Sequence, residues 1–254
     1  MKIPALTGTI KRRVLVNYRA DPDVIAALLP APFRPKLHRG YAMVGICLIR
    51  LEHERPSGFP VIVGFGSENA AHRFAVEWTE ADGSLSEGVY VPRRDTDSLA
   101  NRLAGGRLFP VKSHAAHFTG SDSDGHFELS MRSVDRSCEV QVVGDDVDEL
   151  PQGSCFLSLD EASAFFERGS RGYSPSTGSE GFDAIDLVTP GWRVRALKVS
   201  RVYSSYFKDA SRFPAGSIEF DHALVMRNLA HEWQAVGQIG GVSSSWVRVS
   251  SPVT

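Results

Sequence analysis

Apolar and polar residues alternate with a period of two through much of this 254-residue chain. The clearest case is the segment 126–132, where Phe127, Leu129 and Met131 alternate with polar side chains, and the pattern resumes at Cys138. Successive side chains of a β-strand point to opposite faces of the sheet, so this pattern is typical of half-buried strands joined by a polar turn. Similar patterns occur at 41–51, 74–78, 88–91, 192–203 and 217–226. The sequence therefore predicts a mainly β, antiparallel fold.

Helix signals are few and short. Asp21 followed by proline predicts a helix over 22–29, and a capping box that begins at Ser158 predicts another over 159–168. A third is expected near 97–104, where a glycine pair ends an apolar face. No repeat or clear linker divides the chain, so residues 1–254 are expected to form one domain. A β domain of this length fits a curved, nearly closed sheet around a pocket better than a sandwich.

Charge and cysteine content exclude several classes of protein. The 28 Lys and Arg residues nearly balance 30 Asp and Glu residues, which gives no electrostatic reason to expect a nucleic-acid or membrane partner. The longest uncharged apolar run, at 41–49, is shorter than the roughly 20 residues of a membrane-spanning helix. Cys47, Cys138 and Cys155 form an odd set without C-x-x-C spacing, which indicates free, space-filling thiols. No secretory signal is visible, so a cytoplasmic location is expected. No metal or cofactor is expected either.

Common catalytic motifs do not occur in the sequence: there is no G-x-S-x-G elbow, no P-loop and no H-E-x-x-H. His114 and His117 have a spacing that would suit zinc on a helix. In a strand the two rings would point to opposite faces, and this structural reading is the favoured one.

Several short segments together resemble acetoacetate decarboxylase and its sister branch, the YqjF-like proteins of unassigned function. They run in order from about residue 10 to residue 235, and their combined spacing is more specific than any one of them. The segments shared with the decarboxylase are Tyr18–Asp21, Leu29–Phe33 and Phe220–Leu224. Those typical of the sister branch are Glu68-Asn69, Arg73–Val76, Gly88–Val91, Leu224–Arg227 and His231–Trp233.

The resemblance implies a closed or cone-shaped antiparallel β-barrel with a central pocket, and it raises the question of imine chemistry. In the decarboxylase, the first lysine of a Pro-Lys-Lys run forms a Schiff base with a β-keto acid. The matching stretch here places Val111 at that position and Lys112 at the second lysine. Adjacent strand residues face opposite ways, so Lys112 forms an imine only if a bulge redirects it; otherwise it is an ordinary structural lysine. Efficient decarboxylation of acetoacetate is therefore not expected.

The resemblance also implies other site residues. Glu68 matches an active-site glutamate and would manage protons, although an ion pair with an arginine is an equally weighted reading. Lys11 falls where the family has an arginine suited to a substrate carboxylate, and Arg73 is a further carboxylate clamp. Arg107, His114 and Lys11 are the candidates to substitute for the missing activating cation, and His114 is also a candidate for substrate binding. Glu68 and Arg73 are expected on or beside the principal cavity, with Glu68 as the inward member.

Two functions remain open at this stage. The first is a small-molecule pocket protein, in its catalytic form a lyase-type enzyme acting on an oxo-acid or related carboxylate. The second is a non-catalytic binder of a small apolar ligand in the same cavity. In both cases a small molecule is the expected partner, and assembly as a homo-oligomer stays open.

Overall fold

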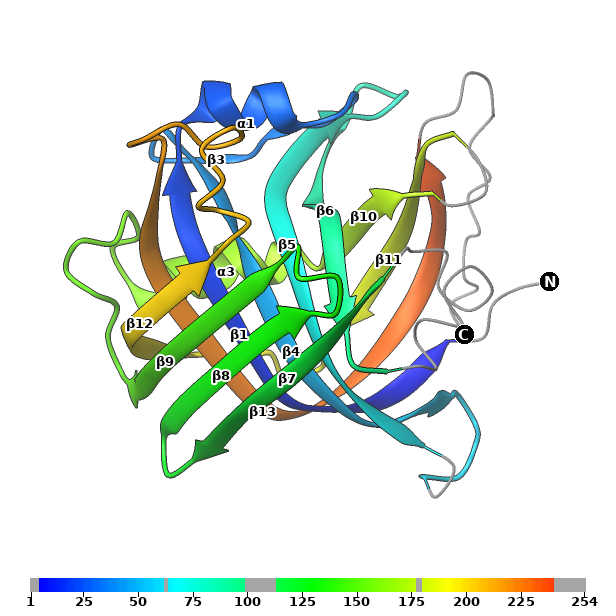
Figure 1. The fold of residues 1–254 in the computed structure, drawn as a ribbon. Coiled ribbons are helices and arrows are strands. Elements are labelled where there is room, and N and C mark those ends of the chain that lie inside the picture. The colour runs from blue at the N-terminus through cyan, green and yellow to red at the C-terminus, as the bar shows by residue number, and fades with distance from the viewer. Residues whose placement is uncertain (1–4, 62–63, 99–112, 177–179, 240–254) are drawn as a thin grey trace.

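The computed structural model describes residues 5–61, 64–98, 113–176 and 180–239 (Figure 1). Long strands make up most of this part of the chain. The strands are β1 (Leu6–Ala20), β2 (Arg34–Pro35), β3 (Leu37–His38), β4 (Tyr41–Pro56), β5 (Phe65–Thr79), β6 (Leu85–Thr96), β7 (His114–Ser123), β8 (His126–Ser133), β9 (Glu139–Val147), β10 (Arg171–Pro175), β11 (Phe182–Val188), β12 (Arg195–Ser204) and β13 (Ile218–Ile239), and the helices are α1 (Pro22–Leu28) and α3 (Leu159–Arg168).

Strand pairing closes two circuits that share β13, β1, β4, β5 and β6. In the first circuit β10 and β11 connect β6 back to β13, and in the second β7, β8, β9 and β12 make that connection. Figure 1 shows β7, β8, β9 and β12 as a layer at lower left, with β10 and β11 at the right. All pairings are antiparallel except those of β6 with β7 and with β10. The shared strands therefore separate two interiors.

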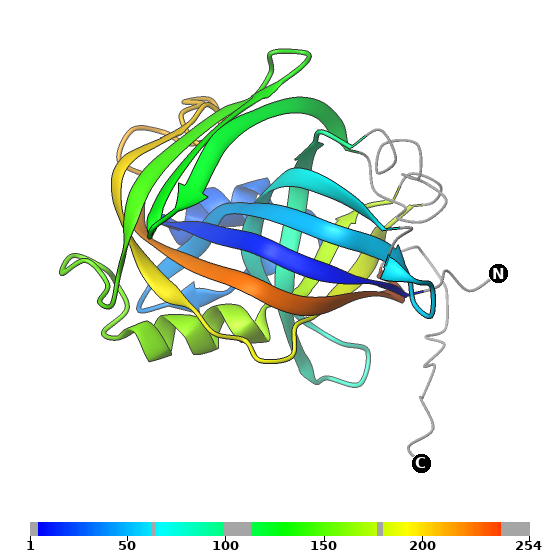
Figure 2. The same ribbon diagram turned by 90° about the horizontal axis from the view of Figure 1, so that it is seen from below.

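The shared strands are buried on both faces. Val14 and Val16 of β1 pack in a core with Phe127 of β8, whereas Leu15 between them packs in a second core that includes Phe165 of α3. In Figure 2 the shared blue and orange strands cross the middle, with the green strands above and α3 below. A strand covered on both sides needs no polar face, which explains the uninterrupted apolar run at 41–49 in β4.

Both helices begin where their caps predict. The Asp21 side chain accepts a hydrogen bond from the backbone of Asp23 at the start of α1. Ser158 accepts one from the backbone of Glu161 at the start of α3, and the Glu161 carboxylate accepts one from the backbone of Leu157. Such a reciprocal cap satisfies donors that the first helical turn leaves free. The apolar face of α3 then covers one end of the first circuit, next to the site described below.

The mainly β class, the hairpin at 126–142 and the helices near 22–29 and 159–168 are confirmed. The helix expected near 97–104 falls largely outside the described residues, and the described residues contain two helices. The three cysteines are free and buried, as expected. None of the described helices is long and apolar enough to cross a membrane.

Candidate functional site

The interior of the first circuit contains a cavity of about 120 Å³, and a smaller hollow of about 60 Å³ adjoins it beneath α3. Seven residues line both hollows, so we treat them as one site. These are Arg13, Cys47, Ala71, Arg94, Ile185, Leu187 and Trp233. On the side of the larger hollow the remaining wall is mixed. Ile49 and Leu51 of β4 and Ala70 are apolar, whereas the polar members are Glu54, Asn69, Asp95, Thr96 and Ser113.

Three arginines from three shared strands line this site, which we call the arginine cavity. They are Arg13 of β1, Arg73 of β5 and Arg94 of β6, and Arg73 lines the smaller hollow. Arg13 Nε donates to Cys47 Sγ over 3.3 Å, and Arg94 Nε donates to Ser174 Oγ over 3.3 Å. The guanidinium of Arg73 lies over the ring of Phe166, 4.8 Å from its centroid. Neutral groups therefore hold all three guanidinium groups in place.

No carboxylate in the described part of the chain forms an ion pair with any of the three arginines. Burial lowers the pKa of Arg73 to about 10, and the nearby positive charge of Arg13 acts in the same direction. Burial likewise lowers the pKa of Arg94 to about 10. The buried atoms Arg13 Nη1 and Arg73 Nε have no hydrogen-bond partner. A buried charge without a counterion is unfavourable, and donors without a partner can bind an anion.

A chain of hydrogen bonds positions Arg73. Its Nη2 donates to Asn17 Oδ1 over 2.5 Å, and Asn17 Nδ2 lies 3.0 Å from His222 Nε2. The other ring nitrogen of His222 lies 2.6 Å from the carboxylate of Asp221. Burial lowers the pKa of His222, so its imidazole is neutral, donates to Asp221 and accepts from Asn17. This arrangement leaves the Asn17 carbonyl for Arg73 and fixes the orientation of the guanidinium.

A buried acid–base pair stands at the wall of the larger hollow. Glu54 of β4 lines the cavity and forms an ion pair with His231 of β13, and both side chains are buried. Gly8 of β1 makes room for this pair, because a Cβ at that position would lie 2.6 Å from Glu54 Oε1. Neither Glu54 nor its role was singled out from the sequence. The strand pairing of β4 shifts its register next to Glu54, so the alternation of side chains does not predict which way Glu54 points.

Glu68 lies apart from the arginine cavity, in a polar groove of about 340 Å³ that also contains Lys11 and Asp97. Its carboxylate accepts a hydrogen bond from Arg12 at 2.7 Å and one from Arg50 at 3.4 Å. Burial raises the pKa of Glu68, and the two arginines partly oppose this effect. The spacing of five residues does place Glu68 and Arg73 on opposite faces, but Arg73 lines the arginine cavity and Glu68 braces β1 against β5.

The other expected site residues are scattered. Lys11 is exposed and borders the groove of Glu68. His114 begins β7 and lies 3.4 Å from the carboxylate of Asp135, and His117 is exposed on the same strand. Lys112 and Val111 lie outside the described residues. The next residue, Ser113, lines the arginine cavity.

One group of described residues has the donor atoms and proximity to hold a metal ion: His72, Asp95 and Cys138. Asp95 also lines the arginine cavity, although its carboxylate is engaged by Arg93 at 2.7 and 2.8 Å.

Comparison with known proteins agrees with this architecture. The model of the DUF2071 family, described as an uncharacterized conserved protein, matches residues 7–219. A search of curated proteins gave no match. The fold is similar to that of acetoacetate decarboxylase from Legionella pneumophila, with a TM-score of 0.59 and 12% identity over 94% of this chain and 87% of that chain.

Two further structures share the fold. An acetoacetate decarboxylase-like enzyme from Sphingomonas wittichii has a TM-score of 0.61 and 11% identity, over 94% of both chains. The enduracididine biosynthesis enzyme MppR, complexed with pyruvate, has a TM-score of 0.59 and 12% identity over 94% of this chain and 90% of that chain. At these identities the likeness establishes the fold alone, and it confirms the resemblance found in the sequence.

Proposed function

The chain belongs to the DUF2071 family of uncharacterized conserved proteins, and we propose that it binds a small oxo-acid through its carboxylate in the arginine cavity. One observation carries the proposal: Arg13, Arg73 and Arg94 all line the smaller hollow, Arg13 and Arg94 also line the larger one, and no carboxylate of the described chain forms an ion pair with them. A guanidinium and a carboxylate form two parallel hydrogen bonds, which suits the free donors of this site.

The size of the cavity limits the ligand. A cavity of about 150 Å³ accommodates benzene, which has six heavy atoms. The larger hollow, of about 120 Å³, therefore suits a ligand of similar size, such as pyruvate, with its carboxylate toward the arginines. The structurally similar MppR is complexed with pyruvate, which makes this molecule a reasonable first probe.

In the catalytic form of the proposal the ligand keeps its carboxylate, and the reaction takes place at the carbon beside the oxo group. Three guanidinium groups stabilise a bound carboxylate in the ground state, which opposes its loss as carbon dioxide. We assign Glu54 as the base that removes a proton from the carbon beside the oxo group. The C–H electron pair then forms a carbon–carbon double bond, and the π electron pair of the oxo group moves to its oxygen. The product is an enolate, which the arginine cations stabilise. Lyase-type reactions that retain the acid group begin with this step.

Calorimetric titration with pyruvate tests the binding. We expect saturable binding of pyruvate and none of pyruvamide, its neutral amide, because the amide lacks the anionic group. Arg94→Met should weaken pyruvate binding by about 10- to 100-fold, the value of one charged hydrogen-bonding partner. Arg201→Met is the matched control, since Arg201 is exposed on β12. Equal binding of pyruvate and pyruvamide would exclude recognition of the carboxylate.

Proton exchange tests the catalytic form. In D₂O the protein should speed deuterium incorporation into the pyruvate methyl group, as followed by NMR, and Glu54→Gln should remove this activity without abolishing pyruvate binding. Incubation with acetoacetate and borohydride should give neither a reduced lysine adduct nor protein-dependent carbon dioxide release. An adduct on Lys112, with release lost in Lys112→Ala, would instead make the protein an imine-forming decarboxylase.

A non-catalytic binder of a small apolar ligand is the second candidate, and the apolar wall formed by Ile49, Leu51 and Leu187 favours it. In that case the neutral pyruvamide would bind at least as tightly as pyruvate, and no deuterium would enter either molecule.

A further inference from the structure

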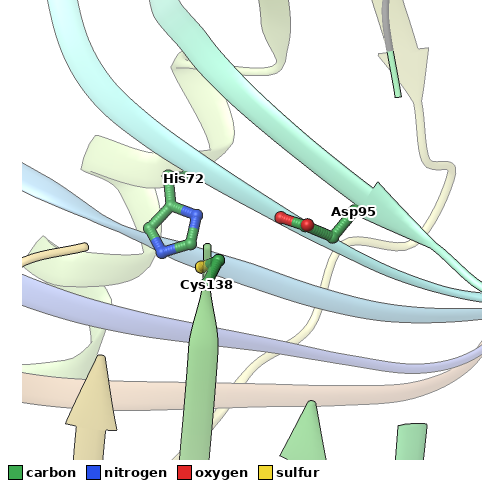
Figure 3. Close-up of side chains that lie close together, drawn as sticks. All are labelled: His72, Asp95 and Cys138. Atoms are coloured by element: carbon green, nitrogen blue, oxygen red, sulfur yellow. The ribbon is translucent and has the colours of Figure 1, made fainter. Parts of the chain in front are cut away.

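Three buried side chains of different chemistry meet between β5, β6 and the start of β9. They are His72 of β5, Asp95 of β6 and Cys138, the residue before β9, and each offers a ligand atom within 4.8 Å of the other two. In Figure 3 the carboxylate of Asp95 and the thiol of Cys138 lie beside the imidazole ring of His72. All three residues are fully buried.

His72 presents a free lone pair to this cluster. Its Nε2 lies 3.3 Å from Ser204 Oγ, whereas its Nδ1 is buried and has no hydrogen-bond partner. Burial lowers the pKa of His72 to about 3, with further lowering by Arg93 and Arg212, so the ring is neutral at physiological pH. If Nε2–H donates to Ser204, the Nδ1 lone pair is the unsatisfied group, which costs free energy in a buried position. A metal ion bound at Nδ1 would satisfy it.

Neighbouring groups hold the other two side chains. Arg93 donates to both oxygens of Asp95, at 2.7 and 2.8 Å, and a carboxylate retains further lone pairs when it is held in this way. The backbone N–H of Cys138 donates to Ser133 Oγ over 2.9 Å, which fixes the chain at the sulfur. Such outer hydrogen bonds are the usual support of metal ligands.

We infer that His72, Asp95 and Cys138 form a binding site for Zn²⁺. The set combines a neutral imidazole, a carboxylate and a thiol, the three kinds of side chain that zinc accepts, and the sulfur favours zinc over magnesium or calcium. Ligand atoms of tetrahedral zinc lie about 3.5 Å apart, so small side-chain rotations close the site. Three protein ligands leave one position for water or a small ligand. The zinc site does not depend on the proposed binding of a carboxylate in the arginine cavity. The two sites share one residue, because Asp95 also lines that cavity.

Zinc binding at this site must release a proton. Cys138 is buried away from solvent and its sulfur is a thiol before the ion arrives, whereas zinc binds the thiolate. On binding, the S–H bond breaks, the proton passes to solvent and the sulfur electron pair forms the bond to zinc. The positive charge of Arg93 then balances part of the added negative charge of the thiolate and carboxylate.

Metal titration of the full chain, after treatment with a chelator, tests the inference. We expect one Zn²⁺ per chain by calorimetry, with about one proton released per ion when the titration is repeated in buffers of different ionisation enthalpy. Co²⁺ used in place of zinc should give a thiolate-to-cobalt charge-transfer absorption, which only a cysteine ligand produces. A wild-type protein that binds no Co²⁺ with this absorption would overturn the inference.

Variants locate the ion. Cys138→Ser should remove the charge-transfer absorption and weaken Zn²⁺ binding more than about tenfold, and His72→Gln should weaken it similarly. The matched control is Cys155→Ser, which alters a buried free thiol elsewhere and should leave the absorption unchanged. Loss of the absorption in Cys155→Ser but not in Cys138→Ser would contradict the assignment. Circular dichroism checks each variant, and if Cys138→Ser does not fold, His72→Gln and the wild-type cobalt spectrum decide.

Discussion

Replacing Arg94 by methionine should make the ligand-free protein more stable while weakening its binding of pyruvate. Methionine keeps the apolar stem of the side chain and removes only the charge and its donors. An ordinary buried ion pair would behave in the opposite way, because loss of one partner leaves the other charge buried and unpaired. The prediction therefore separates a functional cation from a structural one.

The magnitude follows from the pKa of Arg94, which burial lowers from 12.5 to about 10. At pH 7 the group is charged in both the folded and the unfolded chain, so this shift corresponds to about 3 kcal/mol against folding. Because the pKa of Arg94 is lower in the folded than in the unfolded chain, the charged form opposes folding. This destabilisation is complete below about pH 10 and disappears above the pKa of the unfolded chain. Arg94 is partly accessible, so water reduces this penalty. Loss of the hydrogen bond to Ser174 in the variant then offsets about 1 kcal/mol of the expected gain in stability.

A net gain of about 1–2 kcal/mol in the free energy of unfolding is therefore expected, or about 2–8 °C in Tm for a chain of this size. Urea unfolding without ligand, with the slope compared between variants, measures the change. Arg201→Met is the control and should alter neither stability nor binding. Destabilisation of Arg94→Met by more than 1 kcal/mol, with pyruvate binding unchanged, would refute the reasoning.

Three further predictions follow from the geometry. Asp221→Asn should remove a stability contribution of about 2 kcal/mol. Burial raises the pKa of Asp221, but hydrogen bonds from His222, Ser154 and the Cys155 backbone outweigh this effect and lower the pKa to about 2, so the wild type has the contribution above the ordinary carboxyl pKa and loses it as the pH falls toward 2. Urea unfolding between pH 7 and pH 3 measures the difference, and identical pH profiles of wild type and variant would contradict the prediction. Glu68→Gln should cost about 1–3 kcal/mol, because it weakens the pairing of buried Arg12, yet leave pyruvate affinity within about twofold. Gly8→Ala should displace Glu54 and slow deuterium exchange into pyruvate more than about tenfold with little effect on its Kd, and unchanged exchange would argue against Glu54 as the base.

Alternation and capping are local properties, so the sequence predicts strands such as β4, β8 and β9 and both described helices. It does not predict β1, β10 or β11, which lie outside the segments where strands are expected. The hairpin of β8 and β9 and the capping box at Ser158 need only a few neighbouring residues to form. Closure of the two circuits depends instead on pairs distant in the sequence, such as β11 with β13 and β6 with β10. These long-range pairings decide which face of each shared strand meets a cavity.

The site is less readable for the same reason. The sequence does not decide which of the consecutive residues Lys11, Arg12 and Arg13 points inward, because a shift in the β1–β4 pairing between Ile10 and Arg12 sets this. The order Glu68 and Arg73 predicts opposite faces but not which face encloses the arginine cavity. Likewise His72, Asp95 and Cys138 meet only through the pairing of several strands, and no motif spacing indicates it.

A crystal structure of the protein soaked with pyruvate tests the central claim most directly. The account predicts pyruvate in the cavity within the first circuit, with its carboxylate in hydrogen-bond contact with the free donors of Arg13 and Arg73 and its methyl group toward Glu54. Pyruvate found instead beside Lys11 and Arg50 in the groove of Glu68, or a carboxylate turned away from all three arginines, would contradict it.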